Sequence, residues 1–198
     1  MVDTIRYYVA LLVLLALPPG IMLWYAVHPF VHFWRRLGPV WTYVVLSVPA
    51  IGLSVLMFLA RATLLGQDLG MSYPLTALGA LFFVAGTAIA LLRRKHLTSK
   101  ILTGYSELAP EKHPTQLLTS GIYSRVRHPR YLEAILFILG YALFANYSGL
   151  YGMVGLSVVG IYLVVLLEER ELRERFGAEH EEYCRRVPRF IPRWKGDS

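Results

Sequence analysis

The longest apolar stretch of the chain, residues 131–167, constrains the fold more than any other feature. It is 37 residues long, whereas one helical crossing of a bilayer needs about 20. The sequence Asn-Tyr-Ser-Gly at 146–149 interrupts it near the middle, and Asn, Ser and Gly favour turns. We therefore expect two membrane helices that form a tight hairpin.

Three further apolar blocks precede this hairpin, at residues 7–27, 41–60 and 73–92. Charged residues make up only 17% of the chain, whereas soluble domains are nearer a quarter charged. The sequence therefore predicts an all-α, polytopic integral membrane protein with about five transmembrane helices.

The chain is expected to form a single domain, 1–198, in two parts. Residues 1–92 would supply three membrane helices, and residues 93–198 a polar loop, the hairpin and a polar tail.

The distribution of positive charge predicts the orientation. With five spans, 2 of the 20 Lys and Arg residues fall on the side of the N-terminus and 18 on the side of the C-terminus. Because positive residues collect on the cytoplasmic side, we expect the N-terminus outside and the C-terminus in the cytosol. The net charge of +7 is thus explained by membrane topology, and no nucleic-acid partner is expected.

Residues 117–131 carry the densest set of functional candidates. Arg127 and His128 precede Pro129, which suits the first turn of a helix. The free N–H groups of that turn would attract an anion, and Tyr123 and Tyr131 offer flat rings beside it. This pattern predicts a cationic, aromatic pocket at the membrane surface. Anchoring of phospholipid headgroups by the same residue types is the alternative.

The adjacent carboxylates Glu168 and Glu169 follow the last apolar stretch. Two acids at the edge of hydrocarbon are expensive to desolvate unless cations meet them. A tight hairpin would return them to the membrane level of residues 127–131. The combined site would suit a zwitterionic ligand with extra positive charge.

The order of these motifs resembles the isoprenylcysteine carboxyl methyltransferase family. The segment 121–131 reads G-x-Y-x-x-x-R-H-P-x-Y, an acidic pair and Phe-Gly follow the hairpin, and 187–192 reads V-P-x-F-I-P. The resemblance covers roughly 112–193 and extends to phospholipid N-methyltransferases and membrane thiol S-methyltransferases. The three N-terminal blocks match only as hydrophobic spans.

The resemblance implies an enzyme that uses S-adenosylmethionine (SAM) as cofactor. Arg127 and Glu168 would be catalytic, Arg127 by orienting an anionic acceptor or contacting the cofactor carboxylate. The cofactor would contact Gln116, Leu117, Leu118, Gly121, Tyr123, His128, Pro129, Arg130, Tyr131, Glu168 and Glu169. The acceptor would be lipid-like or lipidated, such as an isoprenylcysteine carboxylate, and would reach a cytoplasm-facing site from the bilayer.

The sequence also departs from this family. Its eukaryotic enzymes carry an arginine one turn before the acidic pair, where this chain has Val164 and Val165. The acceptor atom (O, N or S) and the oligomeric state stay open. Two other classes remain possible, an NADPH-dependent membrane reductase and a non-catalytic scaffold. No metal site is expected, and Glu133 is a further candidate because ionisable residues inside membrane helices tend to be functional.

Overall fold

The computed structural model describes residues 1–94 and 117–192. Within these ranges the regular elements are helices, apart from an isolated bridge between Asp68 and Tyr147. The long helices are α1 (Val2–Val27), α3 (Pro39–Leu59), α5 (Tyr73–Arg94), α8 (Pro129–Ala145) and α9 (Ser148–Phe176). The short elements are η1 (His28–Phe30), α2 (Val31–Leu37), α4 (Arg61–Leu65), η2 (Gly121–Ser124) and α10 (Ala178–Arg186).

Four helices, α1, α3, α5 and α9, are long and apolar enough to cross a bilayer. The fifth, α8, has 17 residues, which is about 26 Å of helix against a hydrocarbon core of about 30 Å. The predicted all-α integral membrane class is confirmed. The side of the membrane that each end faces stays a prediction.

The 131–167 stretch folds back at the predicted turn. Asn146 ends α8 in the left-handed conformation, with φ 55°, which asparagine tolerates better than most residues. Its side-chain amide donates to the carbonyl of Gly70 at 2.8 Å, so the turn is tied to the loop before α5. Gly149 is required by close packing, because a Cβ there would lie 1.9 Å from the carbonyl oxygen of Leu64.

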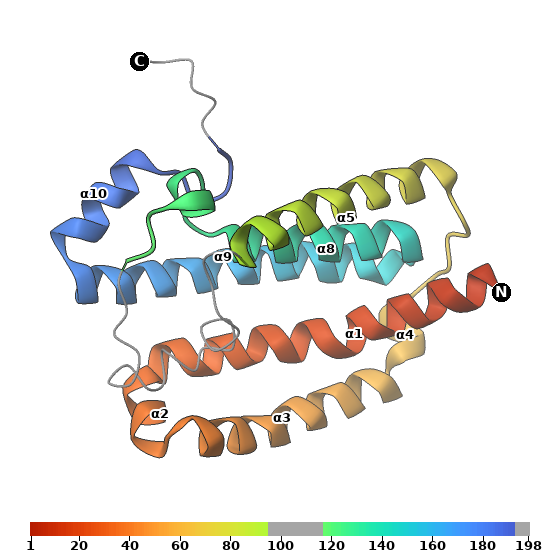
Figure 1. Cartoon of the computed structure of the whole chain (residues 1–198). Coiled ribbons are helices and arrows are strands. Elements are labelled where there is room, and N and C mark those ends of the chain that lie inside the picture. The colour runs from red at the N-terminus through yellow and green to blue at the C-terminus, as the bar shows by residue number, and fades with distance from the viewer. Residues whose placement is uncertain (95–116, 193–198) are drawn as a thin grey trace.

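The helices are arranged in layers (Figure 1). α3 packs on α1, α1 packs on α8 and α9, and α5 covers the other side of α8. The α5–α8 contact is close because glycines face each other across it. A Cβ on Gly79 would lie 2.9 Å from the carbonyl oxygen of Gly140, and one on Gly140 would lie 3.0 Å from that of Gly79. Small residues of this kind let membrane helices approach closely.

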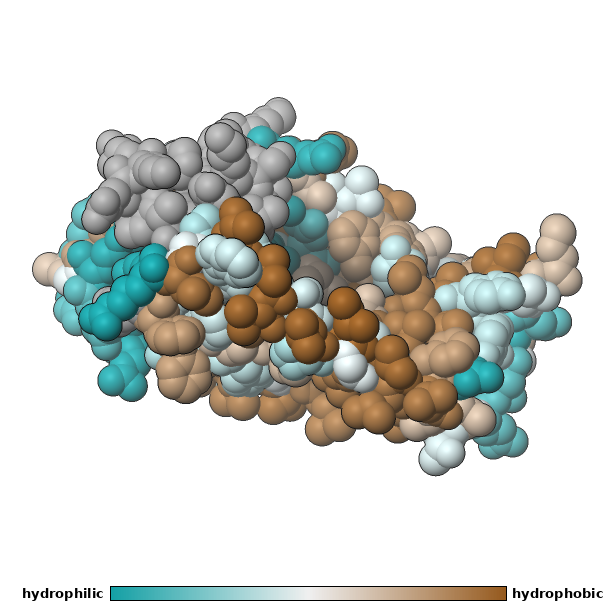
Figure 2. Space-filling view, turned by 90° about the horizontal axis from the view of Figure 1, so that it is seen from below, coloured by the Kyte–Doolittle hydropathy of each residue, from teal (hydrophilic) through white to brown (hydrophobic). Residues whose placement is uncertain are grey.

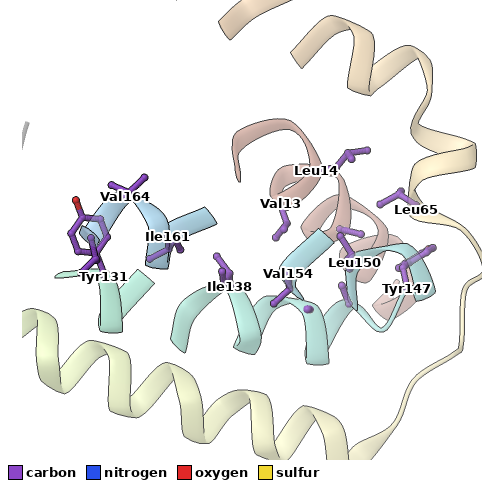
Figure 3. Packing of buried hydrophobic residues seen from close by; sticks show 14 residues of the cluster. Val13, Leu14, Leu65, Tyr131, Ile138, Tyr147, Leu150, Val154, Ile161 and Val164 are labelled. Atoms are coloured by element: carbon purple, nitrogen blue, oxygen red, sulfur yellow. The ribbon is translucent and has the colours of Figure 1, made fainter. Parts of the chain in front are cut away.

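The buried core joins α1, α8 and α9 (Figure 3), and Leu14, Leu150 and Val165 are fully buried in it. The outer faces of the helices are apolar instead of polar; Val48 of α3, for example, is 70% exposed. Figure 2 shows hydrophobic residues over the middle of the molecule and hydrophilic ones towards its two ends, as a bilayer would require.

The two ends hold separate polar clusters. Near the N-terminus, the buried Arg6 is surrounded by the α8–α9 turn and the loop before α5. At the other end lie α2, η2 and α10 (Figure 1), together with the last turns of α9. α9 has 29 residues and extends about 44 Å, so its charged C-terminal turns project beyond the hydrocarbon.

Candidate functional site

The Arg-His-Pro segment lies at the start of α8. Pro129 occupies the first turn, where its missing N–H costs no hydrogen bond, and it is fully buried. The preceding turn η2 begins at Gly121, whose φ of 63° favours glycine. Together these residues deliver Arg127 and His128 to the end of the bundle where α9 also finishes.

A strap formed by residues 187–190 closes this region from the C-terminal side. Gly177, with φ 54°, ends α9 and allows α10 to turn back. The strap then runs along the Arg-His-Pro segment: the backbone N–H of Arg127 donates to the carbonyl of Pro188 at 2.9 Å, and that of His128 to Arg189 at 3.1 Å. The tail is therefore part of the site.

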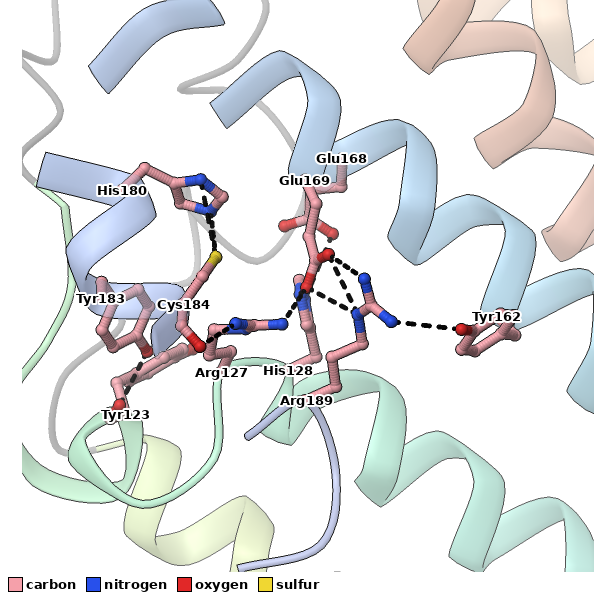
Figure 4. A network of polar contacts seen from close by, with 10 residues as sticks. All are labelled: Tyr123, Arg127, His128, Tyr162, Glu168, Glu169, His180, Tyr183, Cys184 and Arg189. Atoms are coloured by element: carbon pink, nitrogen blue, oxygen red, sulfur yellow. Dashed lines mark hydrogen bonds and ion pairs between the residues drawn. The ribbon is translucent and has the colours of Figure 1, made fainter. Parts of the chain in front are cut away.

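Glu169 lies at the centre of a buried network (Figure 4), and its side chain is only 5% exposed. Its Oε1 accepts hydrogen bonds from Arg127 Nη2 at 2.7 Å and from His128 Nε2 at 3.0 Å. Its Oε2 accepts from Arg189 Nε at 3.0 Å and Nη2 at 2.8 Å. The Glu169 carboxylate on α9 thus links the start of α8 to the strap. Both of its oxygens are already hydrogen-bonded within the protein.

Glu168 is in a different situation although it is the next residue. Consecutive helical residues point about 100° apart, so its carboxylate leaves the Glu169 network. Its Oε2 is buried and has no hydrogen-bond partner among the described residues, and Nδ1 of the His128 ring is 3.9 Å away. That distance is too long for a hydrogen bond. Glu168 therefore offers a free acceptor beside His128.

Arg127 holds the network to α10. Its Nη1 donates to the carbonyl of Cys184 at 2.9 Å, and its Nε is buried without a partner in the described part of the chain. Next to it, the Tyr183 hydroxyl donates to the carbonyl of Tyr123 at 2.7 Å. Burial raises the pKa of both Tyr123, to about 12, and Tyr183. Both phenols therefore stay neutral near pH 7.

A second ion pair flanks the site between α5 and α8. Arg93 Nε and Nη2 donate to the two oxygens of Glu133 at 2.9 and 3.1 Å. The side chain of Arg93 is 8% exposed and that of Glu133 is 15% exposed. Arg130, one turn earlier on α8, stacks its guanidinium 4.1 Å from the ring centre of Trp24 on α1. Glu133 thus has a partner from a different helix.

The structure brings most of the predicted site residues to one end of the bundle. Leu117 and Leu118 precede η2, Tyr123 lies within it, and Tyr131 is buried in the core against the edge of Trp24. Gln116 lies outside the described residues. Which of these side chains contact a cofactor stays a prediction.

Sequence reasoning missed Arg189 and Arg93. Arg189 lies in the V-P-x-F-I-P motif and could have been noticed as a charge between two prolines. Its hydrogen bonds to Glu169 raise its pKa. Arg93 carried one weak signal, its position at the end of an apolar block opposite the ionisable Glu133. The partner of each becomes evident only in the packed structure.

Comparison with known proteins agrees with this arrangement. Residues 74–179, more than half of the chain, match the sequence model of the phospholipid methyltransferase family. The chain belongs to this family. The matched residues include α8, most of α5 and all of α9. The resemblance to isoprenylcysteine carboxyl methyltransferase-like proteins, which are part of the phospholipid methyltransferase family, is confirmed.

Three curated proteins are similar to part of this chain. Methanethiol S-methyltransferase 1 of Bradyrhizobium diazoefficiens is 35% identical over 43% of this chain and 29% of its own length. The nickel-cobalt-cadmium resistance protein NccN of Alcaligenes xylosoxydans is 34% identical over 40% of this chain and 37% of its own length. The mouse Delta(14)-sterol reductase TM7SF2 is 36% identical over 43% of this chain and 21% of its own length.

The matched segments therefore span well under half of each of these relatives. No solved structure is significantly similar to the chain.

Proposed function

We propose that this protein is a membrane-embedded methyltransferase that uses S-adenosylmethionine. The observation that carries the proposal is Glu168 Oε2, a buried carboxylate oxygen without a partner beside His128. A buried charge of this kind is costly unless a cation or donor meets it. SAM carries a sulfonium, an ammonium group and ribose hydroxyls, so it supplies such partners. Membership in the phospholipid methyltransferase family supports the same conclusion.

The other half of the site also fits SAM. Its carboxylate needs donors, and Arg127 Nε is buried and unpartnered, while the first turn of α8 presents backbone N–H groups that favour anions. Glu168 would hold the ammonium or a ribose hydroxyl, and Arg127 the carboxylate. When bound, SAM supplies an electrophilic methyl group.

The protein's contribution is to fix orientation. Methyl transfer needs the donor and acceptor atoms in line at short distance, and holding that geometry supplies much of the acceleration. Glu169 fixes Arg127, His128 and Arg189 through short hydrogen bonds. The strap adds backbone hydrogen bonds to Arg127 and His128. A rigid frame of this kind keeps the reacting groups aligned.

The acceptor is proposed to be lipid-like or lipidated and to enter from the bilayer. A membrane-embedded site suits such a substrate, because moving a long chain into water costs about 0.8 kcal/mol per CH₂. An isoprenylcysteine carboxylate, a phospholipid amine and a thiol are the candidate acceptors. Val164 and Val165 are buried in the core, so those positions cannot supply the charge that an arginine would bring to a carboxylate.

The site is proposed to face the cytoplasm, and in a prokaryote the protein would lie in the cell membrane. The loop 28–40, the end of α5 and the tail lie at one end of the bundle (Figure 1), and they are rich in Arg. This is the distribution that the positive-inside rule requires of a cytoplasmic face.

Titration calorimetry with SAM on the protein in detergent tests the proposal. Wild-type protein should bind SAM, and Glu168→Gln should weaken binding by about ten- to hundredfold, since a charge-assisted hydrogen bond contributes about 1.5–3 kcal/mol. Glu174→Gln is the matched control, because Glu174 lies on the same helix with a 64% exposed side chain. Failure of folded wild-type protein to bind SAM would refute the proposal.

One observation favours a second candidate. The similarity to a mouse sterol reductase covers 43% of this chain, and a cationic site would also suit the phosphates of NADPH. Stabilisation by NADPH but not by SAM in a thermal-shift assay would favour a reductase. A non-catalytic scaffold that binds anionic lipid predicts that neither ligand stabilises the protein.

A further inference from the structure

The Arg93–Glu133 pair is not among the residues assigned to the cofactor above, yet it has features of a binding site. Arg93 lies in the last turn of α5 and Glu133 lies in the second turn of α8, next to the Arg-His-Pro segment. Ionisable side chains at this depth are expensive, and a pair that served packing alone would have every donor satisfied. This pair does not meet that condition.

The guanidinium of Arg93 is only partly used. Nε and Nη2 form the two bonds to Glu133, whereas Nη1 is buried and has no partner within residues 1–94 and 117–192. The side chain is more than nine-tenths buried. A buried cationic donor left open costs free energy, and the bidentate bond to Glu133 fixes the direction in which this donor points.

The open donor belongs to a helix that contacts the site. α5 packs against η2, which contains Tyr123, and the bonds of Arg93 to Glu133 tie the end of α5 to the start of α8. Arg93 therefore contributes an open donor from α5, whereas Glu168 contributes an open acceptor from α9.

We propose that Arg93, held in place by Glu133, binds an oxyanion of a ligand in this site through its free Nη1. A carboxylate or phosphate oxygen matches a guanidinium donor in charge and geometry. The oxyanion belongs either to the carboxylate of SAM or to an anionic acceptor such as a phosphate-bearing lipid. The inference rests on the proposed function for the identity of these two ligands.

The test separates the two sources with two pairs of probes. In the cofactor arm, calorimetry compares SAM with decarboxylated SAM, which lacks the carboxylate. In the acceptor arm, hexadecyl phosphate is compared with hexadecanol in the same detergent micelles.

The variants are Arg93→Gln and the double variant Arg93→Gln/Glu133→Gln, in which the two amides pair and no buried charge is left alone. Arg94→Gln is the matched control, since Arg94 is the exposed neighbour.

Loss of one charge-assisted hydrogen bond should weaken binding of the matching oxyanion probe about tenfold, with no loss of affinity for the counterpart that lacks the oxyanion. If only SAM loses affinity, Arg93 binds the cofactor; if only hexadecyl phosphate does, it binds the acceptor. If both Arg93 variants match Arg94→Gln in both arms, the inference is wrong.

That result could still accompany SAM binding by the wild type, in which case the proposed function would stand. If the wild type binds hexadecyl phosphate but not SAM, the proposed function fails and the acceptor arm still decides the role of Arg93.

Discussion

The two ends of the helical bundle each bury an arginine beside a carboxylate, but they differ in whether the polar groups are satisfied. At the N-terminal end, Arg6 donates to the Ala145 carbonyl from Nε and Nη2 at 3.1 and 2.9 Å, to Asp3 at 2.9 Å, and also to Asp68. Its guanidinium is fully used although it is 0% exposed.

At the opposite end, three buried polar atoms lack partners: Arg93 Nη1, Arg127 Nε and Glu168 Oε2. Within residues 1–94 and 117–192 these are the unpartnered buried side-chain N and O atoms, and all of them are at this end. A buried ion pair alone therefore does not identify a ligand site, because the N-terminal end has one that closes a turn. The unused donors and acceptors distinguish the end at which we propose that the ligand binds.

The largest effect is expected from Glu169→Gln. Removing the charge leaves the buried Arg127 without its carboxylate and the partly exposed Arg189 without its ion-pair partner, and breaking a buried pair in this way costs about 3–5 kcal/mol. Both unfolding free energy in detergent and SAM affinity should fall, and proteolysis should cut the strap at 187–190 more readily. Glu182→Gln, on the exposed face of α10, is the control. Wild-type stability in the Glu169 variant would mean that the network does not hold this end together.

Arg6→Gln should lower the free energy of unfolding nearly as much as Glu169→Gln does, but it should leave SAM affinity almost unchanged. It leaves the Ala145 carbonyl and Asp68 without their cationic donor, at a cost of about 2–3 kcal/mol. The α8–α9 turn lies at the far end from Glu168, so SAM affinity should stay within about twofold, a change below 0.5 kcal/mol. Denaturation and calorimetry on the same preparation, with Arg61→Gln as the control, provide the comparison. A large loss of SAM affinity would show that the two ends are coupled.

The smallest effect concerns pH. Burial lowers the pKa of His180. The charges of Arg127 and Arg173 lower this pKa further, and the charge of Glu169 opposes them. The His180 ring contacts the Cys184 sulfur at 3.6 Å. The folded state thus prefers the neutral ring. Stability contributed by His180 is complete above the unfolded pKa of about 6.5 and declines as pH falls through it.

The melting temperature of the wild type should therefore drop between pH 7.5 and 5.5 more steeply than that of His180→Gln. Parallel slopes would show that His180 does not titrate differently in the folded and unfolded protein.

Several features of the fold could be predicted because they depend on neighbouring residues. The apolar blocks, the turn at 146–149 and the end of α9 at Gly177 all follow from hydropathy and turn preference within a few positions. The predicted meeting of the acidic pair with the Arg-His-Pro segment is present, because a tight hairpin returns the chain to the same level.

The different hydrogen bonding of the two glutamates could not be predicted in this way. Glu168 and Glu169 are chemically identical and adjacent, and only the rotation of α9 against α8 decides which one meets Arg127. The same holds for Arg93 and Arg189, whose partners lie 40 and 20 positions away along the chain.

The sequence by itself determined that this chain is a helical membrane protein with a hairpin and a charged end, since transfer of each segment into lipid is a local free energy. The tertiary structure decided which charged groups are fully hydrogen-bonded within the protein and which keep a buried atom without a partner. That outcome depends on the relative positions of α5, α8, α9 and the strap, because a hydrogen bond forms only when atoms from distant segments meet within about 3 Å.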